Sequence, residues 1–146
     1  MLPSEPPVSR TSLRRPRILL VDDDPAVIRG LWRMLRHARP EYQVNTAAGA
    51  LQAIEALSEL SYDVVITDLQ MPGGGGRAVL NDLVQRYPQT ARVVHSSHVE
   101  AEDASHIRKL AHVVLAKPAT EGEIIDAIEH ALQRVASQKP PVSSAR

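Results

Sequence analysis

The sequence predicts an α/β protein in which helices cover both faces of a five-stranded parallel β-sheet. Two observations point to this class. Short aliphatic runs alternate with longer stretches of helical periodicity along the chain. Several of the aliphatic runs are apolar on both faces, as the inner strands of a covered parallel sheet must be. At 146 residues, the chain has the length of a single domain.

The predicted strands are short and rich in Val, Ile and Leu. The run at residues 42–47 ends in Ala47-Ala48-Gly49, which has no polar or reactive side chain. Such an end suits a strand at the margin of the sheet. In chain order, the predicted strands are residues 17–21, 42–47, 63–67, 92–95 and 112–115.

Each predicted helix repeats apolar residues three or four positions apart, which places them on one face. Thr120 and Glu123 have the spacing of a capping box, so the last helix is expected to begin there. It continues to about Val135, and the fourth helix is only weakly apolar. The first four predicted helices are residues 25–39, 51–60, 77–87 and 101–109.

Both ends of the chain are polar and contain several prolines. We therefore expect disordered tails at residues 1–16 and 137–146 and a folded domain at residues 17–136.

Composition excludes several classes of function. The chain has no cysteine, which removes disulfides, thiolate zinc sites, iron–sulfur clusters and cysteine nucleophiles. The 17 Lys+Arg balance 17 Asp+Glu, so the basic surplus of a general nucleic-acid binder is absent. No apolar run approaches the ~18–20 residues of a membrane span. Because the first residues lack the apolar stretch of a secretory signal, a cytosolic protein is expected.

Polar side chains follow four of the predicted strands. Asp22-Asp23-Asp24 follow the first, Asp68 the third, Ser96 the fourth and Lys117 the fifth. Because ligands of open α/β sheets bind beyond the carboxyl ends of the strands, these groups are expected to share one edge of the sheet.

The acidic residues at this edge each have a structural and a functional interpretation. Asp24 precedes Pro25, the pattern of a helix N-cap followed by proline at the first helical position. Asp22 and Asp23 are either solvated acids or ligands of Mg²⁺, which would relieve their mutual repulsion. Asp68 is either a turn residue or a carboxylate nucleophile that accepts a phosphoryl group.

Three sequence blocks resemble the receiver domain of two-component response regulators. Together they imply the flavodoxin-like receiver fold with strand order 2-1-3-4-5. The resemblance spans residues 17–136, and its blocks are Ile18-Leu19-Leu20-Val21-Asp22-Asp23-Asp24-Pro25, Val64-Val65-Ile66-Thr67-Asp68-Leu69-Gln70-Met71-Pro72 and Leu115-Ala116-Lys117-Pro118.

The resemblance also assigns roles to individual residues. Asp68 is implied as the phosphoacceptor, and the Mg²⁺ ligands as Asp22, Asp23, Asp68 and the backbone carbonyl of Gln70. Ser96 is implied as the switch hydroxyl and Lys117 as the ammonium that pairs with the phosphoryl group. The alternative interpretation of Ser96 is an ordinary strand-end hydroxyl, and that of Lys117 is a solvated charge. The Lys117-Pro118 bond is expected to be cis.

Two further positions, Gln70 and His98, correspond to residues that tune dephosphorylation in this family. Their alternative interpretation is that of exposed polar residues at the rim of the cleft.

The chain departs from the family pattern at two places. Val114 stands three positions before the lysine, where the family usually has an aromatic residue, so the aromatic relay is expected to be absent or altered. The run Gly73-Gly74-Gly75-Gly76 is interpreted as a flexible turn. It is no phosphate-binding P-loop, because Arg77-Ala78 stands where Lys-Ser/Thr is needed.

The resulting expectation is a single-domain response regulator. It would accept a phosphoryl group on Asp68 from a histidine kinase or histidine phosphotransfer protein, with Mg²⁺ as cofactor, and control an unknown output protein. Its fourth helix, fifth strand and fifth helix would form the output face, with phosphorylation-dependent homodimerisation as an option. No direct contact with nucleic acid or membrane and no enzymatic turnover beyond its own slow dephosphorylation are expected.

Two alternatives remain open. One is a receiver-like interaction module that is never phosphorylated, which Val114 and the glycine run favour. The other is a Mg²⁺-dependent phosphohydrolase, which Gln70 disfavours, because such enzymes usually carry a second acid two residues after the nucleophile.

Overall fold

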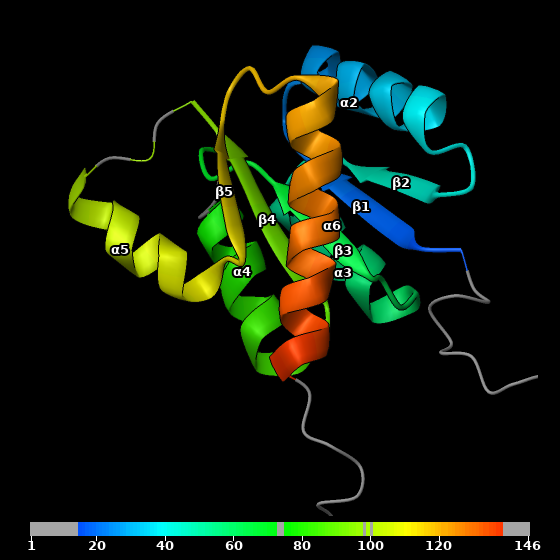
Figure 1. The fold of residues 1–146 in the computed structure, drawn as a ribbon. Helices are drawn as coiled ribbons and strands as arrows, with labels where there is room; N and C mark the ends of the chain where they lie inside the picture. The colour runs from blue at the N-terminus through cyan, green and yellow to red at the C-terminus, as the bar shows by residue number, and fades with distance from the viewer. Residues whose placement is uncertain (1–14, 73–74, 98, 100, 139–146) are drawn as a thin grey trace, which may run out of the picture.

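Five parallel strands form one sheet in the order β2-β1-β3-β4-β5 (Figure 1). The computed structural model describes residues 15–72, 75–97, 99 and 101–138. The predicted α/β class and strand order are confirmed, with β2 at one margin of the sheet. The strands are β1 (Arg17–Val21), β2 (Gln43–Ala47), β3 (Val64–Thr67), β4 (Ala91–Ser96) and β5 (Val113–Ala116).

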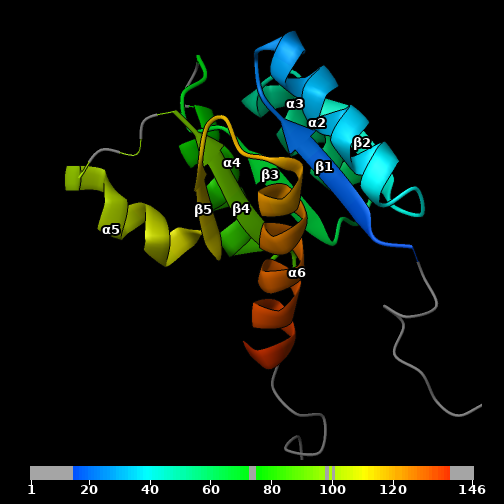
Figure 2. The ribbon, with the colours of Figure 1, turned by 45° about the horizontal axis from the view of Figure 1, so that its top comes forward.

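Helices cover both faces of this sheet. In Figure 1, α6 crosses in front of the strands while α3 and α4 lie behind them, and Figure 2 shows α5 standing out at the β5 side. The helices are α2 (Pro25–Ala38), α3 (Ala50–Glu59), α4 (Gly75–Arg86), α5 (Ala101–Leu110) and α6 (Glu121–Gln138).

Alternating side chains of the central strands supply two separate cores. Ile18 and Leu20 of β1 pack in the cluster that α2 and α6 cover. Leu19 and Val21 pack in the cluster that α3 and α4 cover. The central strands are therefore apolar on both faces because each face is buried under a helical layer.

A smaller third core holds α5. Ile107 is fully buried and packs with Leu80 of α4 and Val94 of β4, and the half-buried Val114 lies against the same cluster. Among the side chains of α5 that the structure describes, residues 104–110, few therefore anchor the helix to the sheet.

The predicted bounds of strands and helices agree with the structure to within two residues, apart from the end of the last helix. That helix begins with the predicted capping box: Glu123 N donates to Thr120 Oγ1 at 3.1 Å, and Thr120 N donates to Glu123 Oε1 at 2.8 Å. It then runs to Gln138, so the C-terminal tail predicted from residue 137 starts too early.

The predicted N-terminal tail likewise includes two residues that the structure describes, Arg15 and Pro16, and the carbonyl of Pro16 accepts a hydrogen bond from Gln43 N. Residues 1–14 and 139–146, the remainder of both predicted tails, lie outside the described residues.

The glycine run is more constrained than the predicted flexible turn. Gly75 and Gly76 are the first residues of α4, and Gly75 has a φ of +54°, a conformation that side chains disfavour. A Cβ at Gly76 would collide with the carbonyl oxygen of Asp68 and lie 2.8 Å from Leu69 Cα. These two glycines therefore permit α4 to start close against the end of β3, whereas Gly73 and Gly74 lie outside the described residues.

Among the residues described, no helix combines the length and apolar character needed to cross a membrane.

Candidate functional site

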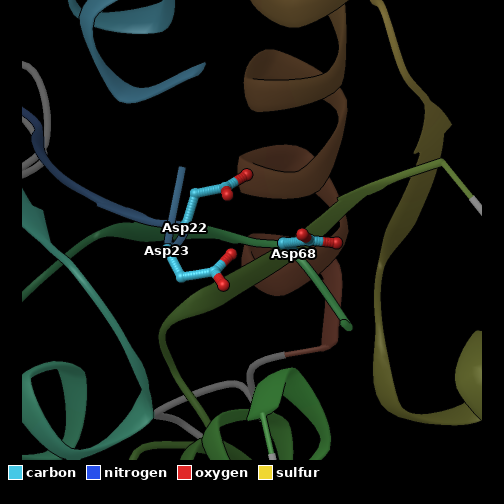
Figure 3. Close-up of side chains that lie close together, drawn as sticks. All are labelled: Asp22, Asp23 and Asp68. Carbon is cyan, nitrogen blue, oxygen red and sulfur yellow. The ribbon is translucent and has the colours of Figure 1, made fainter. Parts of the chain in front are cut away.

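The ends of β1 and β3 bring acidic residues together. Val21 pairs with Thr67 in the parallel register, so the residues that follow, Asp22 and Asp68, emerge side by side. The hydrogen bond from Asp68 N to the carbonyl of Val21, 3.0 Å long, continues this register one residue beyond the strands. Figure 3 shows both side chains with Asp23 at the ends of the two strands.

The three carboxylates form a cluster. Asp22, Asp23 and Asp68 each offer an oxygen that lies within 4.8 Å of the others. Asp22 and Asp68 are only 2% and 6% exposed, whereas Asp23 is exposed. Buried carboxylates repel one another and lose hydration, so this arrangement requires a compensating cation.

Lys117 provides part of that compensation from the loop between β5 and α6. Its Nζ donates to Asp22 Oδ2 at 2.8 Å and to Asp68 Oδ2 at 3.1 Å. Burial works to lower the pKa of Lys117, but the hydrogen bonds to these two carboxylates outweigh it and raise the pKa above its usual value. The Lys117-Pro118 peptide bond is cis, as expected from the sequence.

Backbone N–H groups hold the carboxylates in place. Asp24 N donates to Asp22 Oδ1 at 2.9 Å, and Gln70 N donates to Asp68 Oδ1 at 3.2 Å. The side chain of Asp24 instead turns to α2, where its Oδ1 accepts from Ala26 N at 2.9 Å as the N-cap. The carboxylate of Asp24 is therefore engaged in capping α2. Asp23 makes no hydrogen bond or ion pair within the described part of the chain.

One lysine does not neutralise three carboxylates. Asp22, Asp23 and Asp68 carry three negative charges against the single positive charge of Lys117, which leaves a formal charge of −2. All-oxygen ligands with an excess negative charge are the donor set that Mg²⁺ prefers. The residues present therefore fit a divalent cation.

Ser96 lies at the end of β4 on the same edge of the sheet. Its side chain is 1% exposed, and Oγ has no hydrogen-bond partner among the described residues. The backbone connects it to the site, because Lys117 N donates to its carbonyl at 3.1 Å. An unpaired buried hydroxyl is unfavourable, so Ser96 Oγ loses no hydrogen bond among the described residues if it turns toward a group in the site.

Three further positions were assigned roles from the sequence: Gln70, Val114 and His98. Gln70, two positions after Asp68, has an exposed side chain, Val114 is half-buried against α5, and His98 lies outside the described residues.

Sequence reasoning missed the burial of His95. It is 5% exposed, and neither ring nitrogen has a partner among the described residues. The signal was the alternation of β4, because His95 shares the parity of the buried Val93.

A family model of the response regulator receiver domain matches residues 18–129. The chain belongs to this family. Receiver domains are phosphorylated on an aspartate, bind Mg²⁺ at an acidic pocket and are in general not catalytic beyond phosphoryl transfer. They interact with histidine kinases or phosphotransfer proteins and with output domains.

Two curated relatives of this receiver domain are much longer proteins. The DNA-binding transcriptional regulator NtrC of Escherichia coli (strain K12) is 28% identical over 130 residues, or 88% of this chain and 27% of NtrC. A protein-glutamate methylesterase/protein-glutamine glutaminase of Cereibacter sphaeroides is 33% identical over 112 residues, or 74% of this chain and 30% of that protein. The chain thus spans less than a third of either relative, and their whole-protein activities do not follow from the match.

Solved receiver structures show the same fold. The signal receiver domain of an HD domain-containing protein from Pseudomonas fluorescens Pf-5 has a TM-score of 0.78 and 28% identity, covering 86% of this chain and 100% of that one. The response regulator TrrA from Thermotoga maritima, solved in complex with Mg²⁺-BeF, has a TM-score of 0.71 and 23% identity, covering 80% of this chain and 98% of that one.

Proposed function

We propose that this receiver domain accepts a phosphoryl group on Asp68 and thereby controls a separate partner protein, as a single-domain response regulator does. The observation that carries the proposal is the environment of Asp68. Its carboxylate is buried at a strand end, bonded to Lys117, and adjacent to two further acids. Neither a turn residue nor a solvated acid requires these neighbours.

The proposed reaction is a phosphoryl transfer from phosphohistidine. A carboxylate oxygen of Asp68 attacks phosphorus, the P–N bond breaks, and the imidazole of the donor leaves with the electron pair of that bond. Lys117, already within 3.1 Å of Asp68, would then pair with a phosphoryl oxygen. Ser96 Oγ, which has no partner among the described residues, would donate to another.

The acidic cluster is proposed to hold Mg²⁺ through Asp22, Asp23, Asp68 and the backbone carbonyl of Gln70. Bound there, the cation would offset the negative charge between the carboxylate and the incoming phosphoryl oxygens. Asp23 supports this assignment, because it is exposed and has no competing partner in the part of the chain that the structure describes.

The lifetime of the acyl phosphate is proposed to depend on residues at the rim. Gln70 supports this, because its exposed side chain lies two positions after Asp68, and its backbone N–H already bonds to that carboxylate. His98 is proposed as the second such residue on the basis of its sequence position alone.

The proposed phosphodonor is a histidine kinase or a histidine phosphotransfer protein. The output partner, or a second copy of the chain, is proposed to bind the face formed by α5, β5 and α6. Rotation of the Ser96 side chain toward the phosphoryl group would shift the segment that leads into α5. Ile107 and a few neighbouring described residues anchor α5 to the sheet. A weakly anchored helix reorders at low free-energy cost.

One observation favours the alternative of an unphosphorylated interaction module. Val114 occupies the position of the family's aromatic relay and already lies half-buried against α5. A valine there has no ring to move between exposed and buried positions.

Mass spectrometry of the intact protein tests the proposal. The wild-type chain, incubated with acetyl phosphate and Mg²⁺, should gain one phosphoryl mass, and a chelator should prevent the gain. Asp68→Asn removes the nucleophile at nearly constant volume and should gain nothing. Equal labelling of the Asp68→Asn variant would refute the assignment, and no labelling of the wild type would favour the unphosphorylated module.

A further inference from the structure

The outer face of α2 carries a basic patch around a tryptophan. Arg29, Arg33 and Arg36 recur at helical spacing, and all three side chains are exposed. Trp32 lies among them and is 38% exposed, and the guanidinium carbon of Arg36 lies 4.9 Å from the centre of its ring. These four residues, here called the α2 patch, combine a formal charge of +3 with an uncovered aromatic ring.

The charge of the α2 patch is not compensated within the described part of the chain. None of its three arginines makes an ion pair there. The ion pairs that join α2 to α6 lie beyond the patch, at His37 and Arg39. Tryptophan and arginine are the residue types that most often carry binding energy at protein interfaces. The α2 patch therefore suits a negatively charged surface that also offers an apolar recess.

A groove of about 500 Å³ between β5 and α6 has this character. Val113 and Leu115 of β5 give it a half-buried apolar lining. Glu123, Asp126 and Glu129 of α6 also line it, and the described lining includes no lysine or arginine. All three acids are exposed, and Asp126 makes no hydrogen bond or ion pair among the described residues. This acidic groove is therefore complementary in charge to the α2 patch.

The two surfaces also match in length. Because a helix rises about 1.5 Å per residue, the arginines span about 10 Å along α2 and the acids about 9 Å along α6. Carboxylates accept paired hydrogen bonds from arginine. A recess of several hundred Å³ accepts a group as large as an indole ring.

The α2 patch and the acidic groove lie on different sides of α6. In Figures 1 and 2, α6 stands between α2 and β5, and the groove is on its β5 side. Within one copy of the chain, the arginines of the patch accordingly make no ion pair with the acids of the groove. The complementarity can therefore be satisfied only by a second molecule.

We propose that two copies of this chain associate through the α2 patch of one copy and the acidic groove of the other. Trp32 would pack against Val113 and Leu115, with the arginines facing the carboxylates. A second copy is the partner that fits, because every copy carries both halves of the contact.

This inference rests on the part of the proposed function that assigns the face of α5, β5 and α6 to a partner or a second copy. It names the occupant and the surface that the occupant uses. Association is measured on the unphosphorylated protein, whereas the proposed phosphoryl transfer is measured by labelling of Asp68. The two proposals can therefore fail independently.

Sedimentation velocity over a range of protein concentrations tests the proposal. The wild type should shift from monomer toward larger species as the concentration rises. Adding about 1 M NaCl, at which the Debye length is about 3 Å, should weaken the association. Trp32→Ala should also weaken it, because the ring would no longer fill the recess.

Two charge reversals test the pairing itself. Arg33→Glu on the patch and Asp126→Arg in the groove should each lower the association constant by about tenfold or more, because each places like charges opposite one another. An equimolar mixture of the two variants should associate again, because the intact groove of Arg33→Glu meets the intact patch of Asp126→Arg. This rescue also shows that both variants are folded.

Matched reversals outside the two surfaces serve as controls. Arg108→Glu on α5 and Glu55→Arg on α3 change exposed residues by the same charge and should associate as the wild type does. The proposal is wrong if the wild type stays monomeric at every concentration, or if either Arg33→Glu or Asp126→Arg associates as the wild type does. Failure of the mixed variants to associate would equally overturn it.

Discussion

Neighbouring residues with the same chemistry serve different purposes at the end of β1. Asp22 is buried and bonded to Lys117, Asp24 caps α2, and Asp23 is left exposed between them. Pro25 predicts the capping role of Asp24, but the sequence does not show which of Asp22 and Asp23 is buried, because that depends on which side chain the turn after Val21 directs inward.

Substituting the last two acids separately should separate metal binding from helix capping. Asp23→Ala should abolish Mg²⁺ binding and leave the fold intact or slightly stabilised, because it removes like-charge repulsion. Asp24→Ala should lower the free energy of unfolding by about 1 kcal/mol through loss of the cap, with little effect on Mg²⁺ affinity. Mg²⁺ titration and urea unfolding of both variants measure this. A larger loss of Mg²⁺ affinity in Asp24→Ala would show that the acids are assigned one residue out of register.

His112, at the opposite end of the sheet, makes the unfolding free energy depend on pH. It is 6% exposed, and its Nδ1 accepts a hydrogen bond of 3.0 Å from Arg92 N, which requires the unprotonated nitrogen. Burial, together with the charges of Arg92 and Arg134, lowers the pKa of His112 from 6.5 to about 4.

The direction of the resulting pH dependence follows from linkage. The folded state binds this proton less tightly than the unfolded state, so the stability contributed by His112 is present above pH 6.5 and is lost as pH falls toward 4. His112→Asn keeps an acceptor near the Nδ1 position but does not titrate. It should flatten part of the decline in unfolding free energy between these pH values, and the exposed His106→Asn should not. Identical pH profiles for His112→Asn and wild type would contradict this account.

At the scale of elements, the junction between β3 and α4 depends on close backbone approach. Gly76 N donates to the carbonyl of Leu69 at 3.2 Å, and no side chain fits at Gly76 beside Asp68. The start of α4 is thereby held next to the proposed phosphoacceptor.

Gly76→Ala should therefore destabilise the protein even though alanine is the better helix former. We expect a loss of about 1–3 kcal/mol in unfolding free energy, the range for overpacking a close contact. Gly122→Ala, at an open position of α6, should be neutral or stabilising. Denaturant unfolding measures both variants. Equal unfolding free energies of Gly76→Ala and Gly122→Ala would show that the junction between β3 and α4 accommodates the added methyl group without cost.

Elements with strong local signals were predictable and close contacts were not. The strands were visible because Leu19 and Leu20 are buried on opposite faces, and the start of α6 because Thr120 and Glu123 form a capping box. The early start of α4 was missed because four successive glycines suggest flexibility, whereas the requirement at Gly76 comes from the backbone of Asp68.

For the molecule as a whole, the parallel topology assembles the site. Strand ends far apart in the sequence deliver Asp22, Asp68, Ser96 and Lys117 to one edge, and the sequence predicts this because parallel strands share a carboxyl edge. The ion pairs of Lys117 with two acids could not be predicted, because they depend on side-chain packing between distant segments.

The central claim is that Asp68, and neither of the acids beside it, carries the phosphoryl group. The most direct measurement is reduction of the phosphorylated protein with borohydride, which converts an aspartyl phosphate to homoserine, followed by peptide mapping. We predict homoserine at position 68 in the Mg²⁺-treated wild type. Homoserine at position 22 or 23, or at no position in protein that has gained the phosphoryl mass, would contradict the account.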